Sequence, residues 1–152
     1  MYGFVLITHS WLRYVVLALG VLMIALAFNS SRTRSSWSAR DQRVHQAFLS
    51  ALDTQFLLGA LLYLWLSPLT SAAFADFGAA MKNAHLRFFG LEHAVTMFIA
   101  VAVAHIGKVR ASKQPEAQRA RTVLVFQLIW LVLTCLAIPW PALDVGRPLF
   151  RM

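Results

Sequence analysis

Four long apolar stretches, separated by polar connections, dominate the chain and limit the folds that it can adopt. They cover residues of about 3–28, 44–66, 86–109 and 122–140. An α-helix crosses the hydrocarbon of a bilayer with roughly 20 residues, at about 1.5 Å per residue, so each stretch has a suitable length. The composition, 59% hydrophobic and only 13% charged, is also typical of membrane proteins. We therefore predict an all-α protein with one transmembrane domain over residues 1–152, folded as a four-helix bundle.

The first stretch also has an interpretation as a signal peptide. Arg13 would be its basic region, and the Ala-Leu-Ala at residues 25–27 would be its cleavage site. We expect the segment to be retained as a membrane span. The single cysteine excludes an internal disulfide, and the sequence contains no Cys-x-x-Cys, His-Glu-x-x-His or glycine-rich phosphate motif. Whether the protein is an enzyme is left open.

The basic residues predict how the four spans are oriented. The net charge is +8, and nine of the fourteen Lys and Arg residues lie in the connections 29–43 and 108–121. Basic loops remain in the cytoplasm, so we expect a multi-pass protein of the bacterial inner membrane. Both termini, the connection 67–85 and the tail from residue 142 would lie on the outer, periplasmic side. Basic residues in loops also suit anionic lipid head groups, so the expected partner is the lipid bilayer rather than nucleic acid.

The third stretch carries more ionisable residues than a simple span should, namely Arg87, Glu92, His93 and His105. Such residues are rare in hydrocarbon and usually face a partner, a cofactor or water inside a bundle. In the predicted topology, His93 lies at the same outer depth as His9 of the first stretch. His105 lies at an inner depth together with His45 of the second stretch.

A pair of histidines at one depth is the arrangement that a transmembrane b-type cytochrome requires. Haem iron takes two axial ligands, neutral imidazole supplies both, and the facing helices of a bundle can hold them. We predict that His9 and His93 bind the iron of haem b (heme b), with Arg13 and Arg87 beside its propionates. The protein would then carry electrons to or from a quinone or a redox partner protein.

The inner pair, His45 and His105, is a candidate second haem site. His105 follows His93 by twelve residues, which places the two about 120° apart around their helix axis. The two pairs would therefore have to face different gaps between helices.

The same residues allow a structural interpretation. Arg13, His9, Glu92 and His93 could satisfy one another as a buried polar network that joins the helices. The protein would then be a non-catalytic accessory or assembly subunit of a larger membrane complex. In either interpretation we expect Glu92 to pair with Arg13 or Arg87 as a salt bridge.

Asp53 lies nine residues into the second stretch, close to the middle of the membrane. Gln127 of the fourth stretch is its expected hydrogen-bond partner, because Gln55 points to a different face of the helix. Asp53 is alternatively part of a proton path. Together with Glu92, it leaves open a third class, a proton-coupled transporter, which would need oligomerisation to form a pathway.

Several motifs resemble those of small bacterial four-helix membrane proteins that are often labelled cytochrome b. That group has His-x-x-x-Arg on its first helix, Arg-Phe-Phe-x-x-Glu-His on its third and Ile-Pro-Trp-Pro after its fourth. The matching residues here are His9, Arg13, Arg87, Glu92, His93 and Pro139 to Pro141. The likeness covers nearly the whole chain, but Tyr14 stands in place of a tryptophan and Asp53 in place of a histidine. It implies haem binding and electron transfer, within an oligomer or a larger complex.

Overall fold

A computed structural model describes residues 1–150, and over this range the chain forms helices and no strand. Four helical segments are long and apolar enough to cross a membrane, which makes this a multi-pass membrane protein. They are α1 (Tyr2–Thr33), α2 (Ala39–Leu61) with η1 (Leu62–Leu66), α5 (Ala84–Arg87) with η2 (Phe88–Glu92) and α6 (His93–Ser112), and α7 (Glu116–Ala137). The prediction of an all-α fold with four helices long and apolar enough to span a membrane is confirmed.

The two basic connections are shorter than the sequence indicated, because helices extend into both of them. α1 continues to Thr33 and ends where Arg34 takes a left-handed conformation, with φ of 55°. α2 begins at Ala39, where the Ser38 side chain accepts a hydrogen bond from the Asp41 backbone and the Asp41 side chain returns one. This capping box satisfies backbone donors at the start of the helix. Only residues 34–38 and 113–115 remain as loops.

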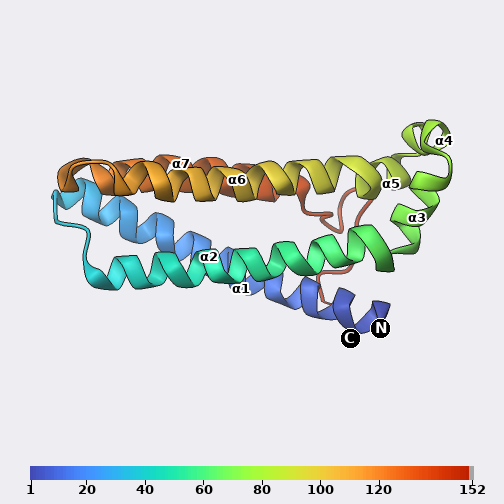
Figure 1. Ribbon diagram of the computed structural model, residues 1–152, viewed down its shortest axis with the longest axis horizontal. Helices are drawn as coiled ribbons and strands as arrows, with labels where there is room; N and C mark the ends of the chain where they lie inside the picture. The colour runs from blue at the N-terminus through green and yellow to red at the C-terminus, as the bar shows by residue number, and fades with distance from the viewer. Residues whose placement is uncertain (151–152) are drawn as a thin grey trace.

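The connection at the opposite end of the bundle is largely helical. α3 (Pro68–Ala75) starts with a proline in its first turn, and α4 (Phe77–Lys82) is capped by the Asp76 side chain, which accepts from Ala79 N at 2.9 Å. These two short helices, together with α5, form the right-hand end of the molecule in Figure 1.

The long helices are not uniformly close to one another. α6 and α7 run side by side, whereas α1 crosses the bundle obliquely and packs against both α2 and α7 (Figure 1). The tightest core lies around the middle of the long helices, where Met23, Phe48 and Trp130 have no exposed surface. The candidate site lies between this core and the end of the bundle that carries α3 and α4.

Trp130 of α7 determines how closely α1 can approach. A Cβ atom added to Gly20 would lie only 2.2 Å from Cζ3 of Trp130, so this contact requires glycine. The indole also meets Phe48 of α2 edge to face, with ring centroids 4.7 Å apart. One buried ring therefore holds three helices together.

Replacing Gly20 with alanine should destabilise the protein by about 1–3 kcal/mol, the usual penalty for inserting a methyl group into a packed core. The matched control is Gly3→Ala on the same helix, where nothing lies within 4 Å of the added Cβ. Unfolding in detergent, followed by helical circular dichroism, measures both. Equal stability of the two variants would contradict the packing described.

Candidate functional site

A cavity of about 460 Å³ lies between the helices, toward the end of the bundle that carries α3 and α4, and it is lined by all four long segments and by the chain after α7. Its volume falls within the roughly 300–1,000 Å³ that is typical of small-molecule sites. Most of the wall is apolar. The polar side chains on it include His9, Arg13, Gln55, His93, Thr134 and Arg147. His9 and His93, predicted to form one site, therefore line one cavity from different helices.

His93 owes its orientation to the Ile-Pro-Trp-Pro segment that ends α7. Ile138 precedes a proline, which disfavours helical geometry, and it is extended with φ of −76° and ψ of 129°. Pro139 and Pro141 have no N–H to donate to the helical carbonyls four residues before them, those of Cys135 and Ala137. The indole of Trp140 donates to the Cys135 carbonyl at 2.8 Å, and His93 Nδ1 lies 2.7 Å from the Ala137 carbonyl.

This contact determines the tautomer of His93. A carbonyl oxygen only accepts hydrogen bonds, so the ring proton must be on Nδ1 and the neutral ring carries its lone pair on Nε2. Histidines that bind metals usually have this arrangement, with one nitrogen held by a backbone carbonyl and the other free to coordinate. In the neutral ring of His93, Nε2 is therefore the nitrogen that could coordinate a metal.

His9 is held from α2. The Gln55 side-chain nitrogen donates to the His9 carbonyl at 3.0 Å and lies 3.3 Å from His9 Nε2, which must then be the acceptor. Gly59, one turn further along α2, leaves room for the ring, since a Cβ there would lie 3.1 Å from His9 Cε1. A metal bound by His9 Nε2 would take the place of the Gln55 amide. His9 could therefore bind a metal through Nε2 once the Gln55 amide has moved away from that nitrogen.

Buried polar atoms without partners cluster around the cavity. His9 Nδ1, Gln55 Oε1, Trp130 Nε1 and Thr134 Oγ1 all belong to lining residues, and none has a hydrogen-bond partner among residues 1–150. Most buried polar groups in native proteins are satisfied, so a cluster of exceptions requires a reason. A bound molecule with polar groups of its own would supply the missing partners.

Two arginines line the cavity without a carboxylate partner in residues 1–150. Arg13 donates to the Tyr14 hydroxyl at 2.9 Å and to the Leu149 carbonyl at 3.1 Å. Arg147 donates to His85 Nε2 at 3.1 Å and lies over the ring of Phe89, 4.9 Å from its centroid. Cations beside an apolar cavity favour a ligand with negatively charged groups.

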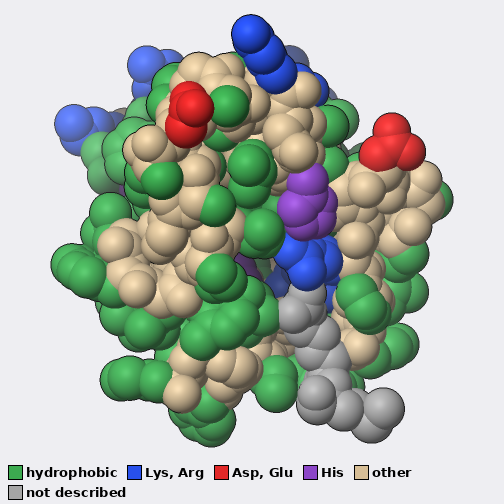
Figure 2. Space-filling view, turned by 90° about the vertical axis from the view of Figure 1, so that its right-hand side faces the viewer, with side chains coloured by type: hydrophobic (Ala, Val, Ile, Leu, Met, Phe, Trp, Pro, Cys, Tyr) green, Lys and Arg blue, Asp and Glu red, His purple; other side chains and the backbone are tan. Residues whose placement is uncertain are grey.

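The chain after α7 forms part of the site instead of extending away from the bundle. Tyr14 donates to the Leu149 carbonyl, and Phe150 stacks on Tyr14 with ring centroids 5.6 Å apart. Figure 2 views this end of the molecule, where a histidine lies directly against a basic side chain on a largely hydrophobic surface. Sequence reasoning missed Arg147 because only the turn of the tail brings it to the cavity. Pro139 and Pro141 before that turn and Pro148 after it were the available signal.

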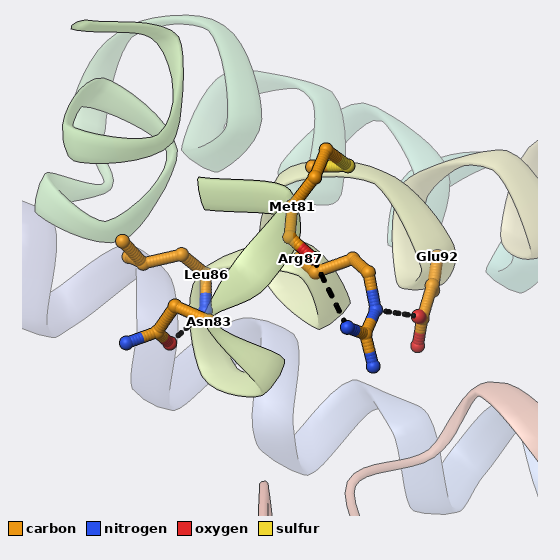
Figure 3. Close-up of polar contacts among 5 residues, drawn as sticks. All are labelled: Met81, Asn83, Leu86, Arg87 and Glu92. Atoms are coloured by element: carbon orange, nitrogen blue, oxygen red, sulfur yellow. Dashed lines mark hydrogen bonds and ion pairs between the residues drawn. The ribbon is translucent and has the colours of Figure 1, made fainter. Parts of the chain in front are cut away.

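Arg87 and Glu92 do not belong to the cavity wall. Arg87 Nε donates to Glu92 Oε1 at 2.7 Å and Nη1 donates to the Met81 carbonyl at 3.1 Å, while Asn83 caps the helix at Leu86 N (Figure 3). The predicted salt bridge of Glu92 with Arg87 is confirmed. The predicted role of Arg87 beside haem propionates is not supported, because its guanidinium is engaged outside the cavity.

The predicted network of Arg13, His9, Glu92 and His93 does not form. Each of the four has a different partner: the tail, Gln55, Arg87 and the end of α7, respectively. The sequence predicted one site for His9 and His93, and the structure places both on the wall of one cavity. The sequence could not indicate that the carbonyl of Ala137, at the proline-rich end of α7, would be the partner of His93.

Asp53 pairs with His105 and not with Gln127. His105 Nε2 donates to Asp53 Oδ1 at 2.7 Å, while the side-chain nitrogen of Gln127 is buried without a partner among the described residues. α2 and α6 are antiparallel, and side chains lean toward the N-terminus of their own helix, so these two lean toward each other. This contact was not predicted.

The predicted inner pair of histidines does not share a site. His45 lies edge-on to Trp37, with ring centroids 6.5 Å apart, and lines a separate cavity at the inner end. His105 lines neither cavity. His45 is also buried. A second haem between them is not supported.

Comparison of the chain with protein-family models, with curated proteins and with solved structures finds no match. The chemistry of the site therefore carries the functional argument. Within residues 1–150, no three His, Cys, Asp or Glu side chains are grouped to hold a metal ion. A metal that enters with most of its own ligands, as porphyrin iron does, requires only one or two from the protein.

Proposed function

We propose that the protein is a b-type cytochrome-like subunit that binds haem b in the 460 Å³ cavity and transfers electrons to or from a quinone or a redox partner protein. The observation that carries the proposal is that His9 and His93, on α1 and α6, line the same apolar cavity. Bound haem would supply a one-electron carrier. The resemblance to small bacterial proteins labelled cytochrome b supports the same assignment.

His93 and His9 would have different roles in holding the iron. The Ala137 carbonyl orients the His93 ring and, by accepting from Nδ1, makes Nε2 a stronger donor to a metal. His9 is positioned by Gln55 and Gly59, and its Nε2 becomes available when the Gln55 amide turns away. The side-chain oxygen of Gln55 has no hydrogen-bond partner among the described residues, so it could accept a hydrogen bond from a ligand.

Arg13 and Arg147 would hold the propionates. Both line the cavity, both lack a carboxylate partner in residues 1–150, and both contact the folded-back tail or belong to it. Charge-assisted hydrogen bonds from arginine to carboxylate are strong and can be bidentate. Arg147 thus takes the role that sequence reasoning gave to Arg87.

For the orientation, we propose that the loops 34–38 and 113–115 are cytoplasmic and that both termini are periplasmic, in a bacterial inner membrane. The basic residues gather around these two loops, and the positive-inside rule retains such loops in the cytoplasm. The cavity would then lie in the outer half of the bilayer.

Asp53 of α2 and His105 of α6 mark one surface of the bundle, called here the α2/α6 face. The exposure of this pair supports assembly into an oligomer or a larger membrane complex. The Asp53 and His105 side chains are 48% and 44% exposed, although Asp53 lies near the middle of a span. Ionisable residues at such depths almost always face protein or water rather than lipid. We therefore propose that another protein surface covers this face, a feature that also fits the alternative of an accessory subunit. A proton-coupled transporter has less support, because Glu92 is engaged by Arg87.

Protein made with ample haem supply should show a Soret band and a reduced-minus-oxidised spectrum of the b type. The substitution His93→Gln should lower the haem content at least about tenfold, since even second-shell changes weaken metal sites by about that much. His9→Gln should do the same. The matched control, His45→Gln, lies outside the cavity and should retain haem. Colourless wild-type protein would refute the proposed function.

The orientation predicts which cysteines an impermeant maleimide can reach. In a Cys135→Ser background, Gly78→Cys in α4 should be labelled in intact spheroplasts. Ser36→Cys in the loop 34–38 should be labelled only after the membrane is opened. The reverse pattern would show that the basic loops lie outside.

If the protein assembles with another protein through the α2/α6 face, residues on that face should contact protein in the membrane. A photo-cross-linking amino acid at position 57, one turn after Asp53 and exposed, should form adducts with protein in native membranes. The same probe at position 132, exposed on α7, serves as the control and should give few protein adducts. Absence of protein adducts at position 57 would count against a covered α2/α6 face.

A further inference from the structure

A second cavity, of about 330 Å³, lies at the opposite end of the bundle, next to the loops 34–38 and 113–115. The haem proposal makes no use of it. Its wall combines the start of α2 with the facing ends of α6 and α7. Six of its lining residues are polar: Gln42, His45, Gln46, Lys108, Ser112 and Arg119.

The ionised side chains on this wall are all cationic. Lys108 and Arg119 line the cavity, and no aspartate or glutamate does. Asp41, one turn before His45 on α2, is engaged elsewhere: its Oδ2 accepts from the Ser38 backbone at 2.9 Å and from the Ser38 hydroxyl at 2.7 Å. Two cations without a facing carboxylate are electrostatically unfavourable unless an anion joins them.

Several donors on the wall are free for such an anion. Arg119 Nε is buried and has no partner among residues 1–150. Lys108 donates one hydrogen bond, to Gln46 at 3.3 Å, and an ammonium group has three to give. His45 is buried beside Trp37, and no described residue forms a hydrogen bond with it. Guanidinium, ammonium and imidazole groups around one small cavity match the several oxygens of a phosphate group.

We propose that this cavity binds a phosphate group, and that the group belongs to the head of an anionic phospholipid. The cavity lies where the helices end and the loops begin, which is the depth of lipid head groups in a bundle that spans the bilayer. Basic pockets between transmembrane helices on the cytoplasmic side are known to take anionic lipid head groups. A bound head group would join the start of α2 to the α6–α7 hairpin. The proposal does not depend on haem.

The test measures binding of phosphatidylglycerol to the full chain by native mass spectrometry, together with the thermal midpoint in detergent. Phosphatidylcholine is the neutral reference lipid, and inorganic phosphate is the soluble competitor. The variant Lys108→Gln with Arg119→Gln should bind phosphatidylglycerol about tenfold more weakly for each charge removed. The control, Lys113→Gln with Arg121→Gln, removes the same charge at exposed residues outside the cavity. It should bind as the wild type does.

Each outcome decides the proposal. Selective binding of phosphatidylglycerol, weakened only by the cavity variant, supports a lipid head group. Selective binding that millimolar inorganic phosphate abolishes supports the phosphate site but assigns it to a soluble phosphate compound. Equal binding of both lipids, or equal loss in both double variants, overturns the proposal. Because Lys108 is exposed, Lys108→Gln alone keeps the test valid if the double variant fails to fold.

Discussion

The packing of Trp130 against Gly20 and Phe48 is the contact on which the rest of the bundle depends. This fully buried ring brings α1, α2 and α7 together near the middle of the helices. Beyond this contact, the oblique path of α1 carries its N-terminal end away from α7 (Figure 1). The ring itself forms part of the wall of the large cavity, which extends from it toward the end of the bundle that carries α3 and α4.

Backbone groups released by proline explain the polar geometry of the cavity. Hydrocarbon offers no hydrogen bonds, so every carbonyl left unpaired at the end of α7 needs a side-chain partner. His93 serves the Ala137 carbonyl and Trp140 serves that of Cys135. The same helix end directs the chain back toward α1, where Leu149 meets Tyr14 and Arg13. One short motif therefore sets the tautomer of a histidine and closes the side of the cavity.

The two ends of the molecule each contain a cavity with cationic side chains, but the other groups on the two walls differ. At one end, an apolar cavity carries two histidines and two arginines that lack carboxylate partners in the described chain. At the other, a small cavity is lined by Lys108, Arg119 and neutral polar groups. Between them, Asp53 and His105 form a pair on the α2/α6 face. The two cavities contain buried polar atoms that the described residues leave without partners, and the Asp53–His105 pair is exposed in the middle of a span, so each place is a candidate contact point for another molecule.

The sequence by itself determined the helical class and the four helices long and apolar enough to cross a membrane, because hydrophobic length and a rise of about 1.5 Å per residue are local properties. It also led us to expect His9 and His93 at one site, and both line the same cavity. The sequence also predicted the pairing of Glu92 with Arg87, as one of two options. Only the tertiary structure decided that Asp53 meets His105, that His45 lies apart from His105 and that Arg147 reaches the cavity. Those contacts depend on how each helix is rotated about its axis and on the turn after α7, and both are set by packing between distant parts of the chain.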